Sequence, residues 1–163
     1  METRRRTKAF EDVQDQIGFC GIWCGSCAVA NGTLRELTQK YEEIIGAYGL
    51  SNWGPKDFDF AELSKGLVSI GSMDLCPGCL KGGGRDECEM KGCAIGKGID
   101  DCSACPEPDA CEHVELLERM RSGALDVGLY VKTESADNRQ LIQKWTDELK
   151  VRWPCRILFT EGQ

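Results

Sequence analysis

Eleven cysteines are the residues of this 163-residue chain with the clearest capacity for chemistry. The stretch CGIWCGSC opens the series with the spacing C-x3-C-x2-C: Cys20, Cys24 and Cys27. Seven more lie between positions 76 and 111: Cys76, Cys79, Cys88, Cys93, Cys102, Cys105 and Cys111. A C-x2-C pair lets one tight turn direct two sulfurs at the same metal ion, and the second stretch contains two such pairs. We predict that these ten cysteines are metal ligands.

Ten thiolates fill two four-thiolate sites and leave two cysteines over. One grouping forms the first site from Cys76, Cys79, Cys88 and Cys93, and the second from Cys102, Cys105, Cys111 and a member of the first triplet. A rival grouping joins the two C-x2-C turns, 76/79 with 102/105, and spacing does not choose between the two. The single histidine, His113, is an alternative ligand. Cys155 stands apart beside Pro154, and we expect it to be a buried apolar filler.

Two kinds of metal centre are compatible with these cysteines. Two zinc ions in closed sites would be structural, and the protein would then be a binding or scaffold module whose partner is another protein. One or two 4Fe-4S clusters would instead make it an electron carrier or redox sensor, a function suggested by the triplet and by the Cys-Pro pair at 105 and 106. Zinc is the preferred interpretation, because paired C-x2-C turns usually build closed four-thiolate sites.

Other uses of cysteine fit the chain less well. A radical S-adenosylmethionine enzyme would need about 200 residues of alternating strands and helices around the triplet, by comparison with full barrels. The CPGC stretch lacks the β-α-β context of a thioredoxin-like dithiol. Disulfides are disfavoured because no secretion signal is visible and thiols stay reduced in the cytoplasm. No set of nucleophile, base and orienting group stands out, so we predict no catalytic residues.

The charge of the chain argues against nucleic-acid binding. The net charge is −7, and residues 74–112 alone contain nine acidic and four basic side chains, so the protein would repel phosphates. The basic run at 4–6 is expected to be a solvated tail. No long apolar stretch is present, which predicts a cytoplasmic protein without membrane contact.

Helices must position the cysteines, because apolar residues recur at helical spacing over most of the remaining chain. The pattern predicts a helix over 33–48, capped by Thr33 and Glu36, and a second over 59–71, capped in the same way by Asp59 and Glu62. It also predicts helices over 109–123 and 135–153 and a short amphipathic turn at 10–17. Their apolar stripes are expected to form the core. A cap at Asp109 would place Cys111 in a first helical turn, where the helix dipole favours a thiolate. Residues 156–159, RILF, are the one strand candidate.

The predicted fold is mainly α: a small helical domain with an irregular, metal-stapled cysteine-rich segment. The whole chain, 1–163, is expected to be one domain, with an N-terminal arm or helix at 1–17, a metal-binding core at 18–123, and a C-terminal helix with a short extended tail at 124–163. The segment from 75 to 111 contains few large apolar residues. Burial alone would not offset its ordering entropy, so a metal must hold it.

The order of the cysteine motifs resembles an uncharacterised cysteine-rich family of bacteria and archaea, a domain of unknown function common in anaerobes. The matching elements are CGIWCGSC at 20–27, CPGC at 76–79, CEMKGCA at 88–94, CSAC at 102–105, and Cys111. The similarity extends from about residue 18 to residue 120. It implies metal binding and no established reaction.

Overall fold

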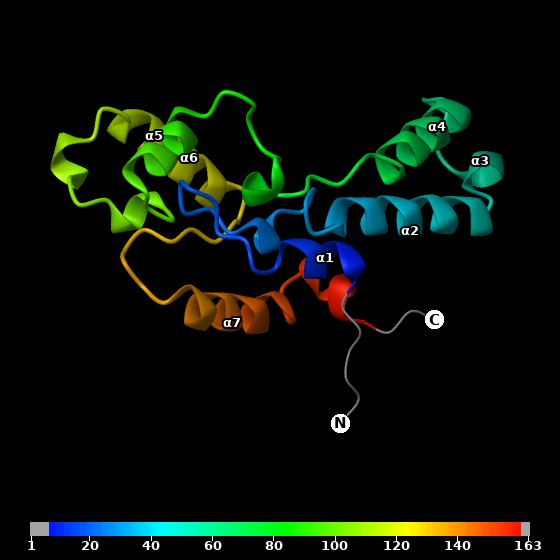
Figure 1. The fold of residues 1–163 in the computed structure, drawn as a ribbon. Helices are drawn as coiled ribbons and strands as arrows, with labels where there is room; N and C mark the ends of the chain where they lie inside the picture. Colours follow the sequence, from blue (N-terminus) through cyan, green and yellow to red (C-terminus); the bar gives the residue numbers. More distant parts are fainter. Residues whose placement is uncertain (1–6, 161–163) are drawn as a thin grey trace.

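The computed structural model describes residues 7–160, and this part of the chain is mainly helical, as predicted (Figure 1). Its α-helices are α1 Lys8–Val13, α2 Thr33–Ala47, α3 Leu50–Trp53, α4 Phe60–Gly71, α5 Glu89–Lys97, α6 Val114–Asp126 and α7 Asn138–Leu149. Five 3-10 helices join them: η1 Cys24–Ser26, η2 Cys79–Lys81, η3 Cys102–Ala104, η4 Pro108–Ala110 and η5 Cys155–Phe159. No helix in the described range is long and apolar enough to span a membrane. The basic run at 4–6 lies outside the described residues.

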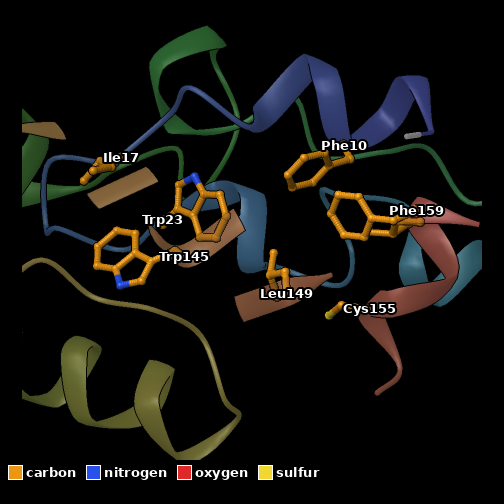
Figure 2. Packing of buried hydrophobic residues seen from close by; sticks show 8 residues of the cluster. Phe10, Ile17, Trp23, Trp145, Leu149, Cys155 and Phe159 are labelled. Atoms are coloured by element: carbon orange, nitrogen blue, oxygen red, sulfur yellow. The ribbon is translucent and has the colours of Figure 1, made fainter. Parts of the chain in front are cut away.

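The main hydrophobic core is aromatic and lies between α1, α7 and η5 (Figure 2). Trp23 is fully buried at its centre, and its ring centroid lies 6.2 Å from Phe10 and 5.6 Å from Trp145. Phe10 also packs edge-on against Phe159 at 5.1 Å. The Trp23 indole Nε1 donates a hydrogen bond to the Gln14 carbonyl at 2.7 Å, so its polar atom is satisfied inside the core. Because Trp23 directly precedes Cys24, the core anchors the first cysteine motif.

Helices α2 and α4 form an arm that extends from this core, with α3 at its far end (Figure 1). The apolar stripe of α2 does not enter the core, contrary to prediction: Tyr41, Ile44 and Tyr48 are 61%, 53% and 69% exposed. Helix α4 packs instead on the neighbouring face of α2, where the Gln39 side chain donates a hydrogen bond to the Gly71 carbonyl at 3.0 Å. Helical periodicity identified a coherent face here, but that face has no partner within the described chain.

The predicted helix bounds agree closely with the structure for α2 and α4 and less well for α7. Asp59 caps α4 by accepting hydrogen bonds from the backbone of Ala61 and Glu62, as predicted. Asp137 caps α7, which is shorter than the predicted 135–153. The capping box for α2 is wrong: Gly32 is its N-cap, and the Asn31 side chain accepts from the Thr33 N–H at 2.9 Å.

Two local predictions in the C-terminal half were wrong, and two helices were not predicted. Helix α6 begins at Val114, after the short 3-10 turn η4, so Cys111 lies before the helix and not in its first turn as predicted. The strand candidate at 156–159 is part of the 3-10 helix η5. Helices α3 and α5 were not predicted; α5 forms within the segment expected to be irregular, and it buries Met90 and Ala94 on one face.

A buried ion pair ties the cysteine-rich segment to the rest of the fold. Lys132 Nζ lies 2.8 Å from Asp101 Oδ2, with side chains only 7% and 2% exposed, and Nζ also donates to Asn138 Oδ1 at 2.7 Å. Burial raises the pKa of the Asp101 carboxyl, but hydrogen bonds from Lys132 and Ser103 outweigh it and hold that pKa below its ordinary value. The backbone of Lys132 pairs with Gly21, next to the first cysteine.

Candidate metal centre

Four cysteines from two distant C-x2-C turns meet beside α1. Cys24, Val13 and Ala30 form a small buried cluster, and Cys27 and Cys76 pack against it. The Cys24 and Cys79 thiols interact with each other, and this interaction lowers the pKa of the Cys79 thiol and raises that of the Cys24 thiol. We call Cys24, Cys27, Cys76 and Cys79 the first group. One turn precedes α2 in the sequence and the other follows α4, so the two meet only in the folded chain.

The backbone of a glycine run lies close to two sulfurs of the first group, those of Cys76 and Cys79. A Cβ placed on Gly83 would lie 2.8 Å from Cys76 Sγ, and one on Gly84 would lie 2.8 Å from Cys79 Sγ. Gly84 also has φ +80°, a conformation that favours glycine. The glycine run at 82–84 therefore serves the close approach of the chain to two thiols.

Four other cysteines line a cavity of about 640 Å³ between α5 and α6. Cys93 comes from α5, Cys102 and Cys105 from the turn around η3, and Cys111 from the residue after η4. Burial raises the pKa of Cys102 to about 11, and the neighbouring Cys111 and Cys93 contribute to that rise. We call Cys93, Cys102, Cys105 and Cys111 the second group.

The two C-x2-C turns at 24–27 and 102–105 have the same backbone design. In each, a 3-10 turn places the two cysteines three residues apart, and the second cysteine donates its N–H to the carbonyl of the first: Cys27 to Cys24 at 3.1 Å and Cys105 to Cys102 at 3.4 Å. Such a turn is the usual backbone form of a C-x2-C pair that binds one metal ion.

Cationic side chains lie beside the second group. Lys97 Nζ is 3.7 Å from Cys105 Sγ and 3.5 Å from Glu107 Oε2, and the Cys105 sulfur is the main reason that the pKa of Lys97 is raised. The Arg121 guanidinium opposes the effect of burial on Cys102 and makes the rise in the pKa of that thiol smaller. Positive charge at this position offsets the negative charge of thiolates.

Cys20 and Cys88 belong to neither group. Cys20 is 8% exposed, and burial raises the pKa of its thiol, with smaller contributions from Cys79 and Cys88. Cys20 also raises the pKa of Cys102, so it lies within electrostatic reach of both groups. Cys88 is the N-cap residue of α5. The arrangement differs from both groupings that sequence spacing allowed, because the triplet supplies a complete turn to the first group and Cys93 joins the second.

The remaining candidates have simple positions. Cys155 is 5% exposed within the aromatic core, which confirms that it is an apolar filler. His113 lines the cavity of the second group, and its Nδ1 lies 3.3 Å from Glu89 Oε2. Among the described residues, no three or more His, Cys, Asp or Glu side chains converge tightly enough to hold a metal ion. The donor chemistry does fit one, because grouped thiols are the ligands that zinc and iron-sulfur clusters prefer.

Sequence reasoning missed two residues that position these groups, Trp23 and Lys132. Trp23 stands between Cys20 and Cys24 and had no part in the predicted sites, although tryptophan side chains are highly buried on average. Lys132 carried no signal in the sequence, because its partner Asp101 is 31 residues away.

Comparison with known proteins identifies the family that the cysteine motifs suggested. No curated protein and no solved structure matches the chain. Residues 16–116 match a family described as protein of unknown function (DUF3795), and this range includes all eight cysteines of the two groups together with Cys20 and Cys88. The match extends over more than half of the sequence, and the chain therefore belongs to the DUF3795 family.

Proposed function

We propose that this protein is a cysteine-rich metal-binding protein with two four-thiolate centres, one in each group of cysteines, and that zinc in these centres is structural. The observation that carries the proposal is the gathering of eight cysteines from five separate segments of the chain into two sets of four. Free thiols that lie close together do not by themselves stabilise the fold, whereas zinc bound by four thiolates does so directly.

The poor core of the cysteine-rich segment supports the same proposal. Between residues 76 and 111 only Met90 and Ala94 are buried apolar side chains, and most of the other residues are half-buried or exposed. Two metal centres would supply the missing stabilisation.

As a scaffold module the protein would bind another protein, and the exposed Tyr41, Ile44 and Tyr48 on the arm support such a partner.

An iron-sulfur protein for electron transfer or redox sensing is the second candidate, and the cavity of the second group favours it. A volume of about 640 Å³ is far larger than one zinc ion needs, since a water molecule takes about 30 Å³. Lys97 and Arg121 beside the thiols would offset the charge of a 4Fe-4S cluster held there by Cys93, Cys102, Cys105 and Cys111.

Metal analysis of protein purified without oxygen tests both candidates. We expect about two zinc ions per chain, because two four-thiolate sites take one ion each. The Cys79→Ala variant should lose about one zinc and Cys155→Ala should keep both, since Cys155 lies in the aromatic core. Equal amounts of iron and sulfide with an absorption band at about 400 nm would favour the second candidate. Protein with neither zinc nor iron would contradict both.

A further inference from the structure

Residues 16–20 form a shared segment between the two groups of cysteines. On the side of the first group, the Gln16 side chain lies across the Cys76–Cys79 turn: its Nε2 donates a hydrogen bond to the Pro77 carbonyl at 2.9 Å. The contact is so close that a Cβ on Gly78 would lie 2.2 Å from Gln16 Oε1. The backbone of Gly18 lies against the same turn, and a Cβ there would be 3.7 Å from Cys79 Sγ.

The other end of the shared segment is bonded to the second group. The backbone N–H of Cys102 donates to the Phe19 carbonyl at 2.7 Å, and Cys102 begins the second C-x2-C turn. Arg121 Nε donates to the Cys20 carbonyl at 2.9 Å, which ties the segment to α6. Gln16, Ile17 and Cys20 are 4%, 4% and 8% exposed, so little water is available to replace these bonds.

A metal in either group would therefore order the same five residues. A four-thiolate site exists only in the folded state, so a bound metal fixes the turns that carry its thiols. Fixing the Cys76–Cys79 turn holds Gln16 and Gly18, and fixing the Cys102 turn holds Phe19 and Cys20. The binding free energy of the first metal is reduced by the entropy lost in ordering residues 16–20. The second metal binds to an ordered segment, so its binding free energy is not reduced in this way.

We propose that the two metal centres load cooperatively through residues 16–20. This inference rests on the proposed function and adds to it a coupling between the centres. The coupling is reciprocal, so losing one metal weakens the hold on the other by the same factor. The protein would pass between a fully loaded and a metal-free state with few intermediates.

Native mass spectrometry of the full chain, given one equivalent of zinc per chain, tests the coupling. Two identical independent sites leave half of the chains with a single zinc, and independent sites of unequal affinity leave more than half. For two sites of equal affinity, a coupling of about tenfold lowers the single-zinc species to about a quarter. For such sites, a single-zinc fraction of half or more overturns the coupling while the proposed function stands. Protein that takes up neither zinc ion contradicts the proposed function itself.

The variant Gln16→Met tests the route, because it removes the Nε2 hydrogen bonds to the carbonyls of Pro77 and Asp12 without changing charge or removing a thiol. We expect it still to bind two zinc ions, with the single-zinc fraction raised to half or more. Gln143→Met is the matched control, since Gln143 is exposed on α7 and its Nε2 donates a hydrogen bond to Asp147 Oδ2 at 3.1 Å. It should behave like the parent protein. A cooperative Gln16→Met variant would show that residues 16–20 do not carry the coupling.

Discussion

At the scale of single residues, burial rather than distance decides what an ion pair contributes. Lys132–Asp101 and Lys150–Asp147 have nearly equal separations, 2.8 and 2.9 Å, but the side chains are 7% and 2% exposed in the first pair and 42% and 57% in the second. Lys132→Met leaves a buried carboxylate unpaired, and we expect a loss of about 3–5 kcal/mol in the free energy of unfolding. Lys150→Met should cost less than about 1 kcal/mol. Urea unfolding at a fixed zinc concentration measures both, and equal losses would contradict the structural role of Lys132.

At the scale of elements, two helices with similar apolar periodicity have different roles. Ile44 on the α2 stripe is 53% exposed, whereas Leu149 at the end of α7 is fully buried in the aromatic core. Leu149→Ala should destabilise the protein by about 2–5 kcal/mol through the cavity that it leaves. Ile44→Ala should change stability by about 0.5 kcal/mol or less, because little apolar surface is lost and alanine favours the helix. Thermal unfolding of the two variants measures the difference, and a comparable loss for Ile44→Ala would show that the α2 stripe is covered in solution.

At the scale of the whole molecule, the aromatic core and the cysteine-rich segment differ in how much apolar surface they bury. The aromatic core around Trp23 and Trp145 involves α1, α7 and η5, whereas residues 76–111 bury few apolar side chains and, under the proposed function, would depend on the metal centres. Removing metal with a strong chelator should unfold the cysteine-rich segment and leave the aromatic core intact. Hydrogen exchange read by mass spectrometry should show protection lost over 76–111 and kept over α7. Full protection of both regions after metal removal would show that the segment folds without metal.

The sequence by itself determined the features that depend on neighbours along the chain. Helical periodicity predicted the mainly α fold and located α2 and α4, and Asp59 marked the start of α4 because a side-chain cap acts within three residues. Because Cys155 lies far along the chain from the other cysteines, its position in the sequence was enough to predict a buried apolar residue in place of a metal ligand. Motif order was also sufficient to recognise the family.

Only the tertiary structure decided how distant segments meet. Spacing could not show that the Cys24–Cys27 turn meets the Cys76–Cys79 turn, because the whole α2–α4 arm intervenes and its length says nothing about where its ends return. Periodicity likewise could not show that the α2 stripe stays exposed, since a pattern reveals an apolar face and not what covers it. The cysteines are local signals, but their division into two groups is a property of chain packing, which brings residues 16–20 between them.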